Sequence, residues 1–385
     1  MLKSDFIRVV SCDMFPTMLL ALFAQLQLPV DIGTVLNFVF LILFLLFIVW
    51  GQKIQIYILM KDIEFVLRRI DLMKDEGRKI SLEKLKKYSA IPDPSAALDR
   101  IIDYILIEPV SLDPAGLVWK LDYLLKVAED RVKGELKQIV PNASDTEREN
   151  ISNVLEVAAS LSIMYRVVRH YYIIGKKTGN QIIIIQLQAM LPDVMIQADA
   201  LMGALYAYTY GHPIGDGTGA LVVANLGYPK EFKDMGRDME VCETDFEGRR
   251  MTILKSKGPG ATVGYPGDSV LDVTKRRKYN LVIMVDAGLK LEGEKSGTVF
   301  EGVGAAIGGI GTEKFKIEEI VANKKIPLYG IIVRMSMKEA LTPLSEEILK
   351  GIDVATTRVK EVIREKVPEG GKVLIVGVGN TVGIR

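Results

Sequence analysis

The hydrophobic pattern of the chain starts with one long uncharged stretch, IGTVLNFVFLILFLLFIVW, from Ile32 to Trp50. At a rise of 1.5 Å per residue, a helix over this stretch spans about 28 Å, close to the thickness of the hydrocarbon core of a bilayer. A signal peptide would have a shorter apolar core and a small-residue cleavage site. The pattern therefore predicts a transmembrane helix over residues 30–51, although a buried core helix would have a similar composition.

Basic residues are distributed unequally around this stretch. Lys3 and Arg8 precede it, and a larger group of basic residues follows it, namely Lys53, Lys61, Arg68, Arg69, Lys74, Arg78 and Lys79. Cytoplasmic flanks of membrane helices carry the excess of Lys and Arg. We therefore expect a single-pass protein of the cell membrane, with a short extracytoplasmic segment at residues 1–29 and a cytoplasmic C-terminal body. Met14 is an alternative start to Met1.

Residues 52–210 follow helical periods almost throughout. Charged residues recur on one face of IYILMKDIEFVLRRIDLM, which favours an amphipathic stalk. Asp113 followed by Pro114 is typical of a helix start, and Ser144 with Glu147 has the spacing of a capping box. The region is predicted to form a cytoplasmic helical stalk and an all-helical domain.

A second apolar segment in this region, IIIIQLQAMLPDVMIQADALMGALYAY, has nearly the composition of a membrane span. Polar side chains interrupt it at Gln186, Gln188, Asp193, Gln197 and Asp199. Polar groups are costly in the hydrocarbon core. The segment is therefore expected to be a helix buried in protein.

Residues 211–385 change to short β-branched runs that alternate with helical periods. Strands are predicted at RRMTILKS, YNLVIMVD, IPLYGIIVRM and GKVLIVGVG, and helices near 268–277, 314–323 and 345–366. This alternation predicts an α/β fold, a three-layer α/β/α domain with a mostly parallel sheet. Ligands of such sheets bind at the carboxyl ends of the strands, where Asp286 and Asn380 are expected.

Composition narrows the chemistry further. The 49 basic and 48 acidic residues nearly balance, so no nucleic-acid partner is expected. The only cysteines are Cys12 and Cys242, without metal-ligand spacing. Glycine-rich loops begin at Gly302 and Gly377, but neither has the spacing of a nucleotide-binding loop. We expect no cofactor.

The stretch GHPIGDGTGALVVANLG begins with the loop GHPIGDGTG, which places Asp216 among four glycines. One interpretation is structural: a turn followed by a helix cap, because Asp before a small residue caps a helix well. The alternative is that the glycines let a substrate backbone approach a reactive carboxylate. The sequence pattern alone leaves both open.

The segment KGPGATVGYPGDSVLDVTKRRKYNLVIMVDAG resembles part of the bacterial spore germination protease, where a glycine-containing run opens a helix and the next strand ends in I-D-A. PIGDGTGALVVANL is similar to that family's aspartate loop and to the D-G-x-G loop of hydrogenase maturation endopeptidases. FEGVGAAIGG and IEEIVANKKIPLYGIIV are similar to its glycine loop and following strand. As a whole, the chain also resembles an archaeal membrane-protein family known only as a domain of unknown function.

The resemblance implies a catalytic pair of aspartates, Asp216 and Asp286, that hydrolyses a protein or peptide substrate. Loops around the substrate would include Gly215, Gly217, Gly219, Thr262, Gly264, Gly302, Gly304 and Asn380. The endopeptidases bind nickel at comparable loops, so a divalent metal at Asp216, Asp286 and His212 is a minor alternative. An inactive peptidase-like scaffold or ligand-binding module at the membrane also remains open, because folds outlive activities.

The chain order departs from that of these peptidases. Their strand ending in G-x-G-N leads directly into the aspartate loop, whereas here KVLIVGVGN is the last strand. A circular permutation would explain the difference. It predicts that the strand at Val373–Val378 lies parallel to the strand of Asp286 or its neighbour, with Asn380 near Asp216.

Overall fold

The computed structural model describes residues 32–106, 114–309 and 311–385. The proposed extracytoplasmic segment, both candidate starts, Cys12 and Asp113 lie outside these residues. The chain divides into two compact units, Met1–Asp62 and Ile63–Arg385.

Helix α2 (Ile32–Tyr88) supplies the described part of the first unit. Its side chains from Ile32 to Phe47 are mainly large, apolar and exposed, and the rings of Phe40 and Phe44 stack with centroids 6.4 Å apart. An apolar helix at Ile32–Phe47 is shorter than a full membrane span. The transmembrane helix expected over residues 30–51 therefore stays a prediction.

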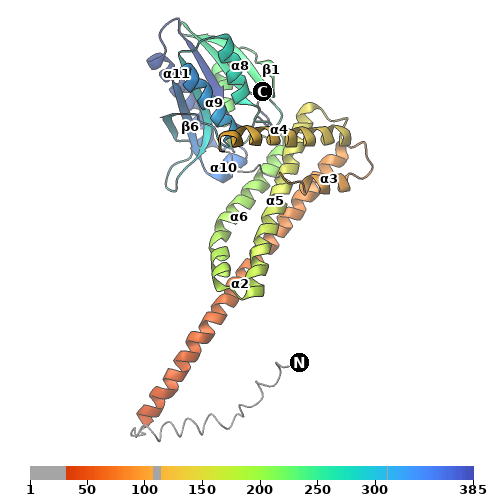
Figure 1. Ribbon diagram of the computed structural model, residues 1–385, viewed down its shortest axis with the longest axis vertical. Coiled ribbons are helices and arrows are strands. Elements are labelled where there is room, and N and C mark those ends of the chain that lie inside the picture. The colour runs from red at the N-terminus through yellow and green to blue at the C-terminus, as the bar shows by residue number, and fades with distance from the viewer. Residues whose placement is uncertain (1–31, 107–113, 310) are drawn as a thin grey trace. The chain divides into compact units, whose positions relative to one another are not determined.

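The second unit begins with the rest of α2 and continues through more helices (Figure 1). Their bounds are α3 (Ser95–Ile102), α4 (Pro114–Ile139), α5 (Asp145–Thr178) and α6 (Gln181–Tyr210). The predicted capping box is confirmed: the Ser144 side chain accepts from the Glu147 N–H, and the Glu147 carboxylate accepts from the Ser144 N–H. Helices α5 and α6 lie side by side as an antiparallel pair (Figure 1).

The prediction that the second apolar segment is buried in protein is wrong for one face of α6. Ile182, Ile185 and Met190 are between 49% and 65% exposed. Leu187, Leu191 and Ala198 are buried on the other face. Both α5 and α6 are long and apolar enough to cross a membrane, a criterion that core helices of soluble proteins also meet.

The remaining elements form an α/β region. Helices and one 3₁₀ turn are η1 (Gly215–Gly217), α7 (Thr218–Gly227), α8 (Pro266–Arg276), α9 (Thr312–Lys324), α10 (Met337–Leu341) and α11 (Glu346–Lys366). Strands are β1 (Lys233–Gly236), β2 (Met239–Phe246), β3 (Arg249–Ser256), β4 (Leu281–Leu289), β5 (Val299–Val303), β6 (Leu328–Met335) and β7 (Lys372–Gly377).

Among the described residues, these strands form one seven-stranded sheet in the order β1-β2-β3-β7-β4-β6-β5. Ladders β3–β7, β7–β4 and β4–β6 are parallel, which agrees with the parallel arrangement predicted for these four strands. Ladders β1–β2, β2–β3 and β5–β6 are antiparallel. The sheet is therefore mixed, and the expectation of a mostly parallel sheet holds only for its centre.

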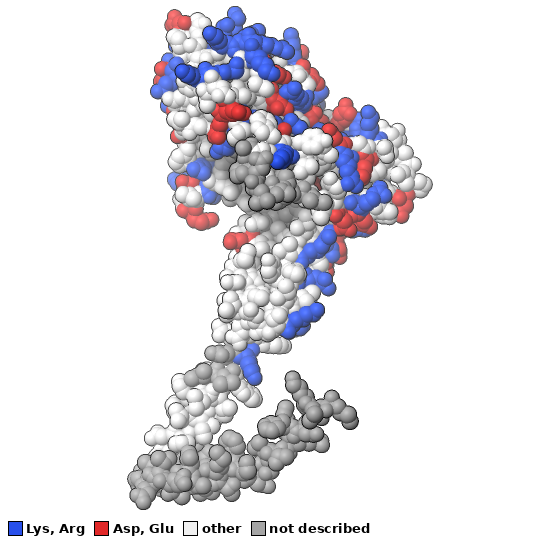
Figure 2. Space-filling model, in the orientation of Figure 1, with Lys and Arg blue, Asp and Glu red and all other residues white. Residues whose placement is uncertain are grey.

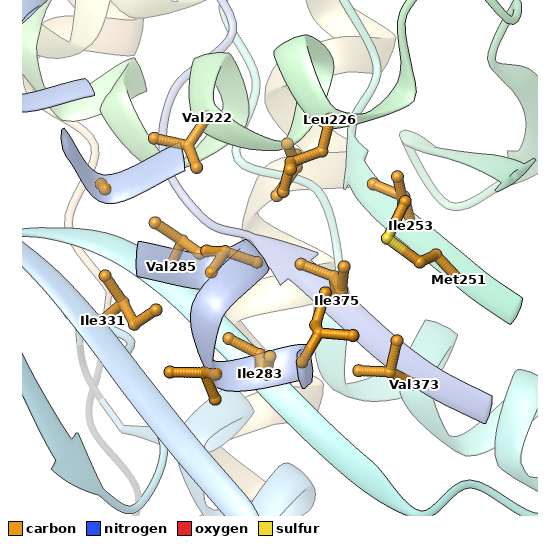
Figure 3. Close-up of a cluster of buried hydrophobic side chains, with 14 of the residues drawn as sticks. Val222, Leu226, Met251, Ile253, Ile283, Val285, Ile331, Val373 and Ile375 are labelled. Atoms are coloured by element: carbon orange, nitrogen blue, oxygen red, sulfur yellow. The ribbon is translucent and has the colours of Figure 1, made fainter. Parts of the chain in front are cut away.

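The central strands are buried on both faces because helices pack on each side. Odd-numbered residues of β4 and β7, such as Ile283, Val285 and Ile375, pack with Val222 and Leu226 of α7 and with α11 (Figure 3). Even-numbered residues, such as Val282 and Met284, pack with α8 and α9. Burial on both faces explains why these strands are almost continuously apolar in sequence.

Candidate functional site

The carboxyl ends of β3, β7, β4 and β6 lie at one edge of the sheet, because these strands are parallel neighbours. The sequence predicted that Asp286 ends its strand. This prediction is wrong, because β4 continues beside β6 to Leu289. The strand that ends here is β7, whose ladder stops at Gly377 opposite Val285. Asp286 is thus the first residue of β4 without β7 as its neighbour.

The glycine loop before α7 is pressed against these strand ends. A Cβ atom at Gly219 would lie 2.2 Å from the carbonyl oxygen of Val285 and 2.4 Å from that of Val378. One at Gly217 would lie 2.6 Å from the carbonyl oxygen of Asn380. These glycines allow two segments of the protein's own backbone to approach closely, so the structure gives them a packing role.

Asp216 lies at the centre of this loop and is partly buried. It does not cap α7, whose first turn begins at Thr218 without a side-chain cap. Instead its Oδ2 accepts a hydrogen bond of 2.8 Å from the backbone N–H of Asn380. The predicted proximity of Asn380 to Asp216, and the pairing of β7 with β4, are confirmed. The relation to a permuted peptidase stays a prediction.

Asp286 is almost fully buried, with 6% of its surface exposed. Its Oδ1 accepts from its neighbour's N–H at Ala287 (2.7 Å), and its Oδ2 accepts from the N–H of Gly308 (3.1 Å). By strand alternation its side chain leaves the same face as Met284, toward the side of α8 and α9. The loop of Gly308 crosses that face.

The two carboxyl groups have perturbed acidities. Burial raises the pKa of Asp286 well above its ordinary value, and the nearby charge of Asp216 raises it further. Burial also raises the pKa of Asp216, against the opposing effect of the Asn380 N–H. Two neighbouring carboxylates, one buried and one partly buried, cannot both ionise cheaply, so the pair favours the state that retains a proton.

Helix α5 of the helical region covers this edge. The Asn153 Nδ2 donates to the carbonyl oxygen of Ala261 (2.7 Å), and the Asn150 Oδ1 accepts from the Ala261 N–H (2.9 Å). The Asn380 Nδ2 donates to the Asn153 Oδ1 over 3.3 Å. Tyr208 of α6 is also close, since the charge of Asp216 adds to burial in raising the Tyr208 pKa.

The structure brings some of the predicted loop residues together and separates others. Gly215, Gly217, Gly219 and Asn380 lie at the strand ends with Asp216. Thr262 adjoins them because its carbonyl oxygen accepts from the Thr381 N–H.

The other predicted glycines lie elsewhere. A Cβ at Gly264 would meet Met239 of β2. Gly302 is an exposed residue of edge strand β5, and the N–H of Gly304 bonds Leu328 at the opposite end of β6. Gly308, of the same glycine-rich run, is the residue that reaches Asp286.

Sequence reasoning missed three contributors to the site: Gly308, Ala287 and Asn153. Two of them act through backbone N–H groups, which every residue except proline carries, so no residue type signals them. The glycine-rich run did point to the right loop. Asn153 lies in a helix far away in sequence, and only the packing of α5 identifies it.

The minor alternative of a metal site finds limited support in the geometry. His212 is exposed, next to the end of α6. Among the residues that the structure describes, no three His, Cys, Asp or Glu side chains are grouped as a metal ion would require.

Comparison with known families covers nearly the whole chain. Residues 37–211 match the family described as "Protein of unknown function (DUF1512) N-terminal domain", and residues 214–385 match "Domain of unknown function (DUF1512) C-terminal". A search of curated proteins gave no match. The two matches meet at the loop of Asp216. The chain therefore belongs to the DUF1512 family, whose name carries no activity.

Proposed function

We propose that the Asp216–Asp286 pair hydrolyses a peptide bond, so that the protein is an endopeptidase that acts on a protein or peptide substrate. The observation that supports the proposal is that Asp216 and Asp286 both lie at the carboxyl edge of the sheet, around the end of β7, where the charge of Asp216 helps to raise the pKa of Asp286. Ligands of parallel sheets bind at this edge.

The acidities of the pair suit this chemistry. In the proposed reaction one carboxylate removes a proton from water, and the water oxygen attacks the amide carbon of the substrate. The other carboxyl group donates its proton as the C–N bond breaks. Asp216 is better suited as the base, since it is partly exposed and accepts only one described hydrogen bond. Asp286 is better suited to hold the proton.

The same proposal places the site at a membrane. Helix α2 between Ile32 and Trp50 would act as a single transmembrane anchor, and the excess of basic residues after Trp50 would keep the body of the chain in the cytoplasm. The α/β region would then be a three-layer peptidase-like domain that faces cytosolic or membrane-associated substrates.

One observation favours a second candidate, an inactive scaffold with a peptidase-like fold. Both oxygens of Asp286 accept backbone N–H groups, from Ala287 and Gly308. A carboxyl group that bridges a strand and a loop in this way can serve structure alone. Hydrolysis by the pair therefore requires that one of these two hydrogen bonds to Asp286 opens, or is shared with the substrate, when substrate binds.

The test compares membranes from cells that express the full chain with membranes from cells that express Asp216→Asn or Asp286→Asn. New protein N-termini are labelled and identified by mass spectrometry. Asp353→Asn, on the exposed surface of α11, is the matched control. If the protein is an endopeptidase, some N-termini should appear with the wild type and Asp353→Asn and be lost in both site variants.

The double variant should be as inactive as either single variant, because paired groups act as one unit. Far-UV circular dichroism and melting curves of each variant show whether its fold is intact. Identical sets of N-termini in the wild type and in folded site variants would support the scaffold instead.

A further inference from the structure

The α5–α6 hairpin carries an exposed apolar surface at its turn. We define the hairpin tip as residues Tyr171–Ile185. Tyr171, Ile182 and Ile185 are 50%, 65% and 49% exposed. Figure 2 shows a broad face of uncharged side chains over α5 and α6, with basic side chains along the edge where α2 also runs. An apolar surface of this kind normally marks an interaction site.

The charge of the hairpin identifies the kind of partner. No Asp or Glu occurs from Val157 to Pro192, although a quarter of the whole chain is charged. The same segment contains Arg166, Arg169, Lys176 and Lys177, and the last two are exposed beside the turn. A segment that combines exposed apolar side chains with basic residues and contains no acidic ones is complementary to an anionic lipid surface.

The position of the tip in the fold supports the same partner. From Ile32 to Met60 the chain has Lys53 as its only charged residue, and Lys61 and Asp62 follow. The next turn of α2 contacts the tip, because the Tyr172 hydroxyl donates to the Glu64 carboxylate and Lys176 lies 3.9 Å from it. The tip thus contacts a turn of α2 that follows Asp62 by only two residues in the sequence.

The turn itself pairs part of its backbone with local side chains. Gly179 ends α5 with φ of +64°, and the Asn180 Oδ1 accepts from the N–H groups of Ile182 and Ile183. Local pairing of this kind lowers the cost of moving backbone into a less polar region.

From these observations we infer that the hairpin tip is a second membrane contact: Ile182, Ile185 and Tyr171 insert among the headgroups of anionic lipids while Lys176 and Lys177 pair with their phosphates. The inference rests on the proposed anchor at Ile32–Trp50. It is independent of the aspartate pair. A contact of this kind would fix the distance of the carboxyl edge of the sheet from the bilayer.

The experiment uses the full chain with Cys12→Ser, in which the remaining native cysteine, Cys242, is buried. A nitroxide label is placed at Ile185→Cys or, as a matched control, at Val354→Cys, which is 55% exposed on α11. The protein is reconstituted into vesicles of phosphatidylcholine with or without phosphatidylglycerol. Electron paramagnetic resonance then measures the access of oxygen, which concentrates in lipid, and of a water-soluble nickel chelate.

The inference predicts that the Ile185 label becomes more accessible to oxygen and less accessible to nickel in phosphatidylglycerol vesicles. The Val354 label should remain in water. The double change Lys176→Glu and Lys177→Glu should return the Ile185 label to the values of the control.

Other outcomes overturn the inference. A water-exposed Ile185 label in anionic vesicles excludes lipid contact. A label shielded from both reagents, with spin–spin broadening, identifies a second copy of the chain as the partner. Flotation separates failure of the tip from failure of the anchor. A protein without an anchor leaves the vesicle fraction, whereas an anchored protein whose tip does not contact lipid stays in it.

Discussion

The backbone N–H of Asn380 donates a 2.8 Å hydrogen bond to the Oδ2 of Asp216, which joins the last residues of the chain to the loop that follows α6. Gly379, just before Asn380, has φ of +122°, and a Cβ there would lie 1.8 Å from the carbonyl oxygen of Asp216. Two distant segments therefore define the position of one carboxylate. Substitutions at this junction should report on the site directly.

Gly219 lies against the backbone of two strand ends. Gly219→Ala should lower the free energy of unfolding by about 3 kcal/mol or more, because its Cβ would overlap the carbonyl oxygens of Val285 and Val378, and backbone cannot move aside as a side chain can. Gly302→Ala is the matched control, since a Cβ there meets no atom within 4 Å. Urea unfolding measures both. Equal stability of the two variants would contradict the tight junction.

Helix α5 should hold the loops of the site through its two asparagines. Asn153→Ala removes the bonds to the Ala261 carbonyl and to the Asn380 side chain, and should destabilise the protein by about 1–2 kcal/mol. Hydrogen exchange should accelerate in residues 258–263 and 379–384. Ser160→Ala, farther along α5, loses only a bond within the helix and should leave those loops unchanged. Unchanged exchange in Asn153→Ala would show that α5 does not hold them.

Much of this fold could be predicted because the central strands are buried on both faces. β3, β4, β6 and β7 appear in the sequence as apolar runs, and α8, α9 and α11 as helical periods between them. The missed strands lie toward the edges of the sheet. β2 contains Glu240, Glu243 and Asp245, and β5 contains exposed Gly302, so neither has a buried-strand pattern. Their pairing is set by tertiary contacts, which override local propensity.

Some features of the site could likewise be predicted from the sequence, and others could not. Asp216 and Asn380 were predictable as neighbours because carboxyl ends of parallel strands share an edge. The continuation of β4 beyond Asp286 was not, since it depends on β6 extending to Met335 while β7 stops at Gly377. The exposure of one face of α6 was also missed, because composition does not show which neighbours a helix will have.

The orientation of the chain can be tested with a reporter fused after Arg385. The basic residues after Trp50 predict that the reporter is cytoplasmic. A fluorescent protein that matures only in the cytoplasm should be bright, and a periplasmic phosphatase fused at the same position should be inactive. The opposite pair of results would reverse the orientation and place the α/β region outside the cell.

Glu149 should make stability depend on pH near neutrality. Burial raises its pKa from 4.5 to about 7, with Asp238 adding to the effect. Because the folded state binds this proton more tightly than the unfolded state, stability should fall as the pH rises from about 4.5 to 7. Partial exposure of the side chain limits the loss in the free energy of unfolding to about 1–3 kcal/mol. Glu149→Gln should flatten this slope in urea unfolding at several pH values, and an unchanged slope would exclude Glu149 as its source.

The aspartate pair should contribute a second pH dependence of the same sign. The pKa of Asp286 is raised by burial and by the charge of Asp216, and that of Asp216 is raised by burial. Above the ordinary carboxyl pKa of about 4, the unfolded chain loses both protons while the folded pair retains one, so stability falls as the pH rises.

Asp286→Asn removes one charge of the pair, which changes this slope. Its single carbonyl oxygen can accept from Ala287 or Gly308 but not from both, so the variant should be less stable than the wild type at pH 4 by about 1–2 kcal/mol. As the pH rises, the difference should shrink or reverse, because the repulsion between the two carboxylates is absent from the variant. Asp216→Asn should show the same trend. In the double variant, the pH dependence of the free energy of unfolding should differ little from that of either single variant. Unfolding free energies that differ from the wild type by a constant amount between pH 4 and 8 would mean that the two carboxyl groups do not interact, and the hydrolytic mechanism would lose its shared proton.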